Sequence, residues 1–493
     1  MREAKNFKLF LPIAAFACVG LGAANGAAPE ASRTSEIAPA GATSLAPCRV
    51  EGVTQPARCG VFEIAEHPDR SDGRRLPIHV LVIPATGVTA LKDPIVPLNG
   101  GPGEDAISTA AAYAERFATL RRDRDLVLID QRGTGQSAPL RCNLYSADEA
   151  ATNLHDFFPL AAVKRCREAL QSRADLTQYT YRHFADDLEH IRRALGYGPL
   201  NLFAGSYGTR AAQIFLRAYP QSVRTVYLGS VVPVDVTIPL PLAKTAQEAL
   251  EKTFTACAAD ADCRAAFPNL REEFRVVLAR LESGAVSVSV PDLDEKVTLD
   301  RGRFAEWARA RLYRPGTAAI LPWVIHRAYL GDWSPIVEGI LSAAQERDSA
   351  ASFGLFFSIT CNDDVAFLRE EDIVPETKAT FLGDYRVRQQ QAACRDWPKV
   401  PLPAGYREPV RSAVPTLFVS GDSDPATPLW FTTRVAAGFS NRAEVVVPGH
   451  GHTEWSDCIA RLYERLVRSG STAGIASTCE PVPRPPFKTT ASD

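Results

Sequence analysis

A serine stands in a segment of small residues that is typical of a strained turn. Ala204-Gly205-Ser206-Tyr207-Gly208 lies between the buried apolar run 201–203 and a helical pattern that begins near Thr209. A serine held in a tight turn between a strand and a helix can act as a nucleophile, because the turn exposes its hydroxyl. A plain glycine-rich turn at a helix start gives the same pattern, so the remaining residues of the chain must decide between the two interpretations.

An acid and a base follow two later strand-like runs. Gly421-Asp422-Ser423-Asp424-Pro425 comes after the run 416–419, and Gly449-His450-Gly451-His452 comes after the run 444–447. The chain order Ser, Asp, His is that of the catalytic triad in α/β hydrolases. We assign the acid to Asp424 and the base to His450, with Asp422 as a turn residue and His452 as a solvated neighbour. The two histidines lack a third ligand, so no metal site is expected.

A glycine-rich loop follows another apolar run. Asn99-Gly100-Gly101-Pro102-Gly103 comes after residues 95–98, at the carboxyl end of a predicted central strand. The backbone N–H groups of Gly101 and Tyr207 are the expected oxyanion-hole donors. A phosphate-binding loop is disfavoured, because neither of the usual glycine spacings for phosphate occurs here. Together these segments predict a serine hydrolase in which Ser206 attacks, His450 takes its proton, and an acyl-enzyme follows.

The elements that must position these loops alternate between short apolar runs and helical patterns. The runs interpreted as buried parallel strands cover residues 94–98, 125–129, 200–203 and 223–228. Helical spacing of apolar residues covers 106–120, 160–170, 182–195 and 209–219, after a hairpin pattern at 61–83. This alternation predicts an α/β fold, with a mostly parallel sheet and helices on both of its faces.

The alternation stops after residue 235 and resumes near the carboxyl terminus. A mainly helical stretch with one alternating run, 286–290, leads to the proline-containing segment 401–403, after which strand-like runs return. We therefore predict a hydrolase core split into two parts by an inserted helical cap, followed by a proline-rich, irregular tail. The predicted boundaries are 45–235 for the first core part, 236–405 for the cap, 406–480 for the second core part and 481–493 for the tail.

The amino terminus resembles a secretory signal. Arg2, Lys5 and Lys8 precede the apolar run 9–24, and small residues follow it, so we predict a signal peptide over residues 1–28. An uncleaved anchor helix or a lipid attachment at Cys18 are the alternatives, and the proline and glycines of the run and the residues around Cys18 disfavour them. The expected location is periplasmic or extracellular, without stable membrane association after cleavage.

The cysteines agree with export. Removing Cys18 from the eleven cysteines leaves an even number, as expected for disulfides in an exported chain. Many connectivities are possible, but neighbouring cysteines form five close pairs, so our hypothesis is sequential pairing. The pairs are Cys48–Cys59, Cys142–Cys166, Cys257–Cys263, Cys361–Cys394 and Cys458–Cys479. Buried reduced thiols are the alternative, and a zinc site is not expected because no ligand spacing for zinc occurs.

Composition excludes two classes of protein. With 46% hydrophobic residues, 23% charged residues and a net charge of −2, the chain is neither disordered nor a nucleic-acid binder. No motif for a cofactor or metal ion is present, and none is expected. The expected partner is a small substrate.

Several motifs resemble the proline iminopeptidase and tripeptidyl aminopeptidase family of α/β hydrolases, and most closely its secreted, disulfide-bearing branch. The motifs lie at 99–103, 130–137, 205–208, 359–363, 424–428 and 449–451. The resemblance implies a serine exopeptidase that releases single residues or short peptides from the free amino end of a peptide, with a cap limiting access. A carboxylesterase or lipase on the same scaffold is the main alternative. A non-catalytic binding module would have lost a member of the triad, and none is lost.

Acidic residues could hold the free amino terminus of such a substrate. Asp363 is the first candidate, followed by Asp364 and Glu104, and a structural ion pair is the alternative interpretation for them. In the segment that begins at Asp130, we expect Asp130 and Arg132 to form a buried pair that stiffens the loop beside the oxyanion hole.

Overall fold

The computed structural model of the chain describes residues 45–70, 72–145, 150–284, 286–289 and 296–490. The predicted signal peptide lies outside the described residues. Within them, no helix is long and apolar enough to cross a membrane.

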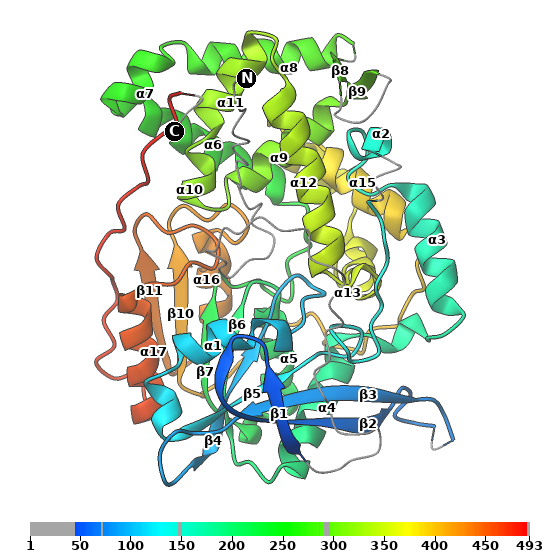
Figure 1. Cartoon of the computed structure of the whole chain (residues 1–493), viewed down its shortest axis with the longest axis vertical. Coiled ribbons are helices and arrows are strands. Elements are labelled where there is room, and N and C mark those ends of the chain that lie inside the picture. Colours follow the sequence, from blue (N-terminus) through cyan, green and yellow to red (C-terminus); the bar gives the residue numbers. More distant parts are fainter. Residues whose placement is uncertain (1–44, 71, 146–149, 285, 290–295, 491–493) are drawn as a thin grey trace, which may run out of the picture.

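The core is a nine-stranded sheet, mostly parallel (Figure 1). Its strands are β1 Ala46–Val50, β2 Val53–Ala65, β3 Arg75–Ile83, β4 Leu91–Leu98, β5 Arg124–Ile129, β6 Leu200–Gly205, β7 Val223–Gly229, β10 Thr416–Gly421 and β11 Arg442–Val447. They follow the order β1-β2-β3-β5-β4-β6-β7-β10-β11. The pairs from β1 to β5 are antiparallel, and the pairs from β5 to β11 are parallel. The predicted fold class is confirmed.

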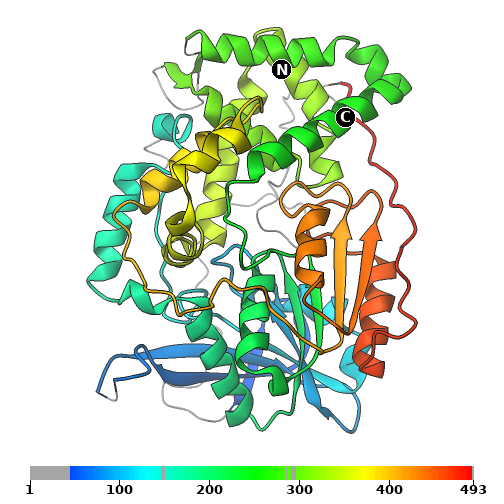
Figure 2. The same ribbon diagram turned by 180° about the vertical axis from the view of Figure 1, so that it is seen from behind.

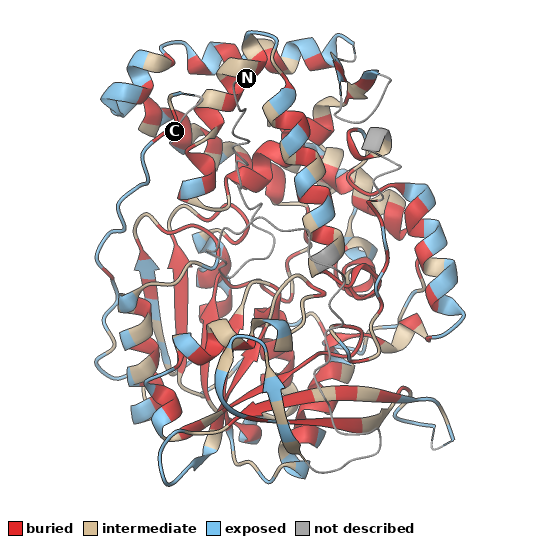
Figure 3. Ribbon diagram, viewed as in Figure 1, coloured by how far each residue is buried: buried red, intermediate tan, exposed pale blue. Residues whose placement is uncertain are grey.

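Helices cover both faces of this sheet (Figure 2). One face carries α1 Ala110–Arg116 and α17 Asp457–Ser469, and the other carries α4 Tyr181–Ala194, α5 Gly208–Ala218 and α16 Leu429–Ala436. Strand side chains point alternately to the two faces. In β5, Leu126 and Leu128 pack against α1 and α17, whereas Val127 and Ile129 pack on the opposite side. The central strands β5, β6, β7 and β10 therefore consist mostly of buried residues, which are red in Figure 3.

Helices lie above the carboxyl ends of the parallel strands (Figure 1). Between β7 and β10 the elements are α6 Leu242–Ala259, α7 Ala261–Ala266, α8 Leu270–Glu282, β8 Val286–Ser289, β9 Lys296–Leu299, α9 Arg301–Arg311, α10 Pro315–Ala318, α11 Leu321–Tyr329, α12 Ser334–Ala350, α13 Phe353–Asp363, α14 Glu370–Thr377 and α15 Tyr385–Cys394. We call these elements the cap. Before α4, α2 Ala150–Asn153 and α3 Leu160–Gln171 approach them, and the Asp348 carboxylate accepts the N–H groups of Leu144 and Tyr145. Two insertions therefore cover the sheet edge.

The carboxyl-terminal tail connects the core to the cap. Val482 N–H donates to the carbonyl of Pro448 at 2.9 Å, and Lys488 N–H donates to the carbonyl of Ala319 at 3.1 Å. Phe487 packs into the buried cluster of the cap. Regular structure is absent from residues 481–489, as predicted, but the segment is extended along the molecule and held at both ends (Figure 1).

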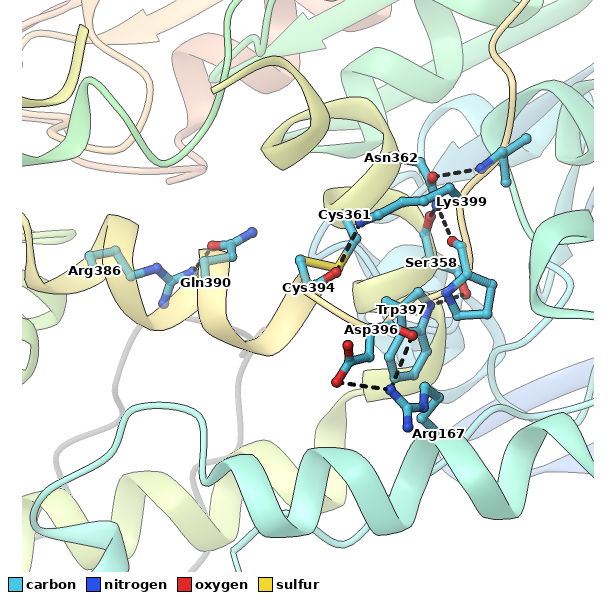
Figure 4. The surroundings of a disulfide bond; sticks show 12 residues. Arg167, Ser358, Cys361, Asn362, Arg386, Gln390, Cys394, Asp396, Trp397 and Lys399 are labelled. Atoms are coloured by element: carbon cyan, nitrogen blue, oxygen red, sulfur yellow. Dashed lines mark hydrogen bonds and ion pairs between the residues drawn. A yellow bond between two sulfur atoms is a disulfide. The ribbon is translucent and has the colours of Figure 1, made fainter. Parts of the chain in front are cut away.

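The predicted disulfide pairing is confirmed in the described part of the chain, where all five sequential pairs are bonded. Figure 4 shows one of them, Cys361–Cys394, which joins α13 to α15. Next to it, the Trp397 indole N–H donates to the Ser358 hydroxyl at 3.2 Å. The bond therefore fixes two helices that contribute side chains to the cavity described below.

Removing this disulfide should destabilise the protein more than removing the shortest one. Cys361 and Cys394 are 33 residues apart, whereas Cys257 and Cys263 are 6 apart, and all four side chains are buried. By the chain-entropy relation, a double Cys→Ala change should lower the free energy of unfolding by about 4 kcal/mol at the first pair and about 2 kcal/mol at the second. Urea denaturation of both variants measures this difference, and an equal or larger loss at Cys257–Cys263 would contradict it.

Candidate active site

Ser206 occupies a strained turn at the carboxyl end of β6. Its φ is +52°, a left-handed conformation that few residues other than glycine adopt, and its N–H donates to the carbonyl of Gly229 at 3.1 Å. A Cβ at Gly208 would lie 2.1 Å from the carbonyl oxygen of Leu98, so only glycine fits where α5 leaves the turn beside β4. The sequence 204–208 therefore forms the tight strand-to-helix turn that its small residues predicted.

Three side chains from three loops form a continuous hydrogen-bonded line. His452 Nε2 lies 2.9 Å from Ser206 Oγ, and His452 Nδ1 lies 2.9 Å from Asp424 Oδ2. The loops follow β6, β10 and β11, whose carboxyl ends share one edge of the sheet. Since an ionised carboxylate can only accept, Nδ1 carries the ring proton and Nε2 is left to accept from the serine hydroxyl. This arrangement can remove a proton from Ser206 as it attacks an acyl group.

The prediction that His450 occupies this position is wrong. The chain turns sharply at Gly449, where φ is +81°, and His450 N–H donates back to the carbonyl of Val447 at 3.3 Å. The carbonyl of His450 accepts from Ser423 N–H at 3.0 Å, which places this residue over the end of β10 and short of β6. Its side chain is buried and does not line the cavity that contains Ser206. Two more residues of loop are needed before a histidine reaches the serine.

Asp424 is held as an ionised acceptor. Its Oδ1 accepts the N–H groups of Ala426 at 2.8 Å and Thr427 at 2.9 Å, and its Oδ2 accepts the Thr427 hydroxyl at 2.5 Å. Burial acts to raise the pKa of Asp424, but His452 and the Thr427 hydrogen bonds outweigh it and lower the pKa. Asp422 instead accepts from Gly449 N–H at 2.9 Å and joins two loops, the turn role predicted for it.

The glycine-rich loop passes directly beside the serine. A Cβ at Gly100 would lie 3.0 Å from Ser206 Cβ, and Gly101, with φ of +112°, lines the same cavity as Ser206 and Tyr207. Asn99 braces this loop. Its amide nitrogen donates to the carbonyl of Asp105 at 2.7 Å, and its oxygen accepts from a tyrosine hydroxyl on α1 at 2.6 Å. The assignment of Gly101 and Tyr207 as oxyanion donors stays a prediction, made on a loop that is held in place.

The expected pair between Asp130 and Arg132 does not form. Arg132 makes two hydrogen bonds to the Asp187 carboxylate on α4, at 2.7 and 2.6 Å. Asp130 accepts backbone N–H groups from Ala106, Ile107 and Gln136 at 2.9 to 3.2 Å. The two side chains have different partners, so each braces a different neighbour. Asp130 thus holds the segment that follows the glycine-rich loop, and Arg132 ties the turn to α4.

A cavity of about 540 Å³ lies between the sheet edge and the cap. Ser206 and His452 line it on the core side, and residues of α9, α12, α13 and α15 line it on the cap side. Tyr313, just after α9, joins the two sides: its carbonyl accepts His452 N–H at 2.7 Å, and its ring centre lies 5.2 Å from that of His452. No sequence motif marks Tyr313, because its role depends on how the cap sits on the core.

The acidic candidates for binding an amino terminus differ in whether they line this cavity. Glu104 lines the cavity and is half-buried, whereas Asp363 and Asp364 do not line it. Asp363 accepts the Tyr406 hydroxyl at 2.9 Å, and Asp364 pairs with Arg210 at 2.9 Å, all of them buried. The expectation that Asp363 anchors a substrate is therefore wrong, and the structural alternative describes both aspartates. Their burial at the carboxyl end of α13 could not be predicted from one sequence.

The Glu104 carboxyl has a raised pKa. Removal from water raises the pKa of Glu104 to about 8, and the nearby Asp105 adds to this effect. A hydrogen bond from Gly100 N–H and the charge of Arg314 act in the opposite direction, but they do not outweigh it. A carboxyl with this pKa can take up or release a proton when a charged group enters the cavity.

Comparison with known proteins places both halves of the site in described families. The family model "alpha/beta hydrolase fold" matches residues 93–260, and the model "TAP-like protein" matches residues 379–479. Serine protease Hip1 of Mycobacterium tuberculosis (strain H37Rv) is 25% identical over 418 residues, 76% of this chain and 77% of its own. Tripeptidyl aminopeptidase of Streptomyces lividans is 28% identical over 192 residues, 36% of each chain.

A solved structure, proline iminopeptidase of Mycobacterium smegmatis, aligns with 83% of this chain and 98% of its own, at 15% identity and a TM-score of 0.38. The first matched family region contains Ser206 and the glycine-rich loop, and the second contains Asp424 and His452.

Proposed function

Because the chain belongs to the TAP-like α/β hydrolases, we propose that it is an exported serine exopeptidase. It would release single residues or short peptides from the free amino end of a peptide, through an acyl-enzyme. The observation that carries this proposal is the line Asp424–His452–Ser206 at the wall of a cavity covered by the cap.

The geometry supports a sequence of proton transfers. Ser206 Oγ attacks the carbonyl carbon of the scissile bond while His452 Nε2 takes the hydroxyl proton, and Asp424 stabilises the resulting imidazolium. Backbone N–H groups of Gly101 and Tyr207 would meet the oxyanion, each contributing about 3 to 4 kcal/mol to lowering the barrier. His452 then gives its proton to the leaving amine and activates the water that releases the acyl unit.

The size and lining of the cavity favour short substrates with a free amino group. Its volume of about 540 Å³ is within the range that holds a ligand of a few residues and excludes a folded chain. Glu104 is a carboxylate partner for an ammonium group on the wall that also carries Ser206. The five disulfides support export, because such bonds persist in oxidising compartments.

Glu104 should give peptide hydrolysis a pH dependence that ester hydrolysis lacks. Holding an ammonium requires an ionised Glu104, with its pKa of about 8, and a protonated substrate amine, whose ordinary pKa is about 8. The kcat/KM for a free-amino peptide anilide, divided by that for a nitrophenyl ester, should therefore rise toward about pH 8 and fall above it. Titration of the triad affects both substrates and cancels in this ratio.

Two variants test this dependence. Glu104→Gln should remove the maximum and lower kcat/KM for free-amino peptides by roughly 30-fold or more, because it leaves the ammonium unpaired. Asp105→Asn removes a charge that raises the pKa of Glu104, so it should move the rising limb to lower pH. An unchanged maximum in Glu104→Gln would assign the amino terminus to another residue.

A substrate panel separates the proposed function from its alternative, a carboxylesterase or lipase. Purified protein is assayed on mono-, di- and tripeptide anilides with free or acetylated amino groups, and on short-chain nitrophenyl esters. We expect turnover of free-amino anilides and little turnover of their acetylated counterparts. Equal turnover of blocked and free anilides would remove the exopeptidase proposal, and turnover of esters alone would favour the esterase.

A further inference from the structure

Two buried arginines line the cap side of the cavity. Arg347 of α12 and Arg386 of α15 are each 8% exposed, and both line the cavity that contains Ser206. Their guanidinium groups lie 4.4 and 4.1 Å from the centre of the Phe157 ring, which also lines the cavity. Long cationic side chains are rarely buried unless a partner balances their charge.

The buried carboxylate of Glu306 lies beside these arginines but is already paired with another arginine. Glu306 makes two hydrogen bonds to Arg309, at 2.6 and 2.8 Å, and only a longer one of 3.3 Å to Arg386. Burial acts to raise the pKa of Glu306, but the charges of Arg309, Arg386 and Arg347 outweigh it and lower the pKa to about 2. The cluster formed by Arg309, Arg347, Arg386 and Glu306 therefore carries more positive than negative charge.

Some donor capacity of the two arginines is unused. Arg347 Nη1 and Arg386 Nε are buried without a hydrogen-bond partner, although Arg386 Nη2 donates to the Gln390 side chain at 3.1 Å (Figure 4). A buried donor left unpaired costs about 1 to 3 kcal/mol, and more when the group is charged. A guanidinium binds a carboxylate through paired, charge-assisted N–H···O bonds. The cavity side of this cluster is therefore built for an anion.

A short path of contacts connects this cluster to the reacting residues. Arg309 Nη1 donates to the Tyr313 hydroxyl at 2.8 Å, and the Tyr313 ring contacts the ring of His452. A ligand that touches Ser206 can therefore extend along one wall toward the arginines.

We propose that Arg347 and Arg386 form a subsite for a carboxylate of the substrate, so that the enzyme prefers short acidic peptides. The inference that the substrate is a peptide rests on the proposed function. The inference that the substrate carries a carboxylate does not. The carboxylate has two possible sources: an acidic side chain in the acyl unit, or the free terminal carboxylate of a short peptide on the leaving side. Either source would pair with the cationic cap side while the amine pairs with Glu104.

The test compares matched acidic and neutral substrates. One series places Asp or Glu against Asn or Gln within peptide anilides, a second compares peptides with a carboxylate or an amide at their end, and a third compares nitrophenyl esters of glutarate and butyrate. We expect a preference of at least tenfold for the acidic member in one peptide series. The glutarate ester carries its carboxylate in the acyl unit, so the esters should show the preference if the first peptide series does. The peptide series that shows it identifies the source of the carboxylate.

Variants assign the preference to the two arginines. Arg347→Gln and Arg386→Gln should each reduce the acidic-to-neutral ratio of kcat/KM at least fivefold, and Arg386→Lys should retain part of it. Arg303→Gln is the matched control, because Arg303 is also buried and lies 5.7 Å from the Phe157 ring centre but does not line the cavity. It should lower Tm without changing the ratio, which separates charge recognition from a structural role.

The subsite and the peptidase proposal can be contradicted separately. A ratio near one in every wild-type series, or an unchanged ratio in both Gln variants, would overturn the subsite even if peptides are cleaved. A preference for glutarate esters without peptide cleavage would retain the subsite and overturn the peptidase. If the Gln variants do not fold, protection of wild-type Ser206 from a fluorophosphonate by glutarate, compared with glutaramide, decides the matter, and equal protection would overturn the subsite.

Discussion

His452→Gln should lower kcat by roughly 10⁴- to 10⁶-fold for any substrate that the enzyme turns over. His452 is the ring within 2.9 Å of both Ser206 Oγ and Asp424 Oδ2, and glutamine cannot take the hydroxyl proton. KM should change little, because the serine hydroxyl is not ionised in the ground state and the cavity keeps its shape.

His450→Gln is the matched control for this loss. His450 lies two residues away in the same loop and is also buried, but it contacts the end of β10 rather than Ser206. It should retain kcat within a few-fold, with a stability change on the order of 1 kcal/mol. Steady-state assays of both variants on one substrate give the comparison, and a larger loss in His450→Gln would restore the assignment made from sequence.

Asp424→Asn should lower kcat by about 10⁴-fold while the fold is retained. Asp424 Oδ2 accepts from both His452 and the Thr427 hydroxyl, so an amide nitrogen at this position would face both of these donors and accept from neither. The ring would then be held with its proton on Nε2, where it cannot accept from Ser206. The loss arises from the tautomer and not from a missing side chain.

Asp422→Asn supplies the comparison for the acid. Its Oδ1 accepts from Gly449 N–H and the Ser423 hydroxyl, and the oxygen of asparagine can accept both. Activity should stay within a few-fold of the wild type, with an unchanged pH profile. Steady-state kinetics of both variants measure their activity, and circular dichroism checks that both are folded. A comparable loss of activity in both would mean that disruption of the loop, and not loss of the acid, causes it.

The core strands could be predicted from sequence because their signal is local. Residues such as Leu126 to Ile129 are apolar on both faces, and a strand buried on both sides appears as a continuous apolar run. The edge strand β1 gave no such signal, since its side chains are exposed or half-buried. Ser206 and Asp424 were found for a related reason, since each directly follows such a run and the carboxyl ends of parallel strands meet at one edge.

The catalytic histidine could not be identified from local sequence patterns. The sheet order places β10 and β7 between β11 and β6, a lateral distance of roughly 14 Å at about 4.8 Å per strand. At about 3.5 Å per residue the chain covers roughly 10 Å between Val447 and residue 450, before the turn at Gly449 takes its share. A histidine at 452 spans this gap and one at 450 does not, but the strand order had to be known first.

The burial of charged side chains could not be predicted from the sequence either. Asp363, Arg347 and Arg386 are buried polar residues, and in a single sequence such residues are typical of solvated surfaces. Whether Asp363 reaches the cavity, and whether the arginines do, depends on how α12, α13 and α15 pack over the sheet edge. Cys361–Cys394 was predicted, but the position of the two helices that it joins was not.

The most direct measurement is the mapping of a covalent adduct. Wild-type protein is treated with a fluorophosphonate probe and digested, and the modified residue is located by mass spectrometry. We predict one adduct on Ser206, no labelling in Ser206→Ala, and labelling that is much slower in His452→Gln but unchanged in His450→Gln. Persistent labelling of Ser206→Ala, or an adduct on another residue, would contradict the assignment of Ser206 as the nucleophile.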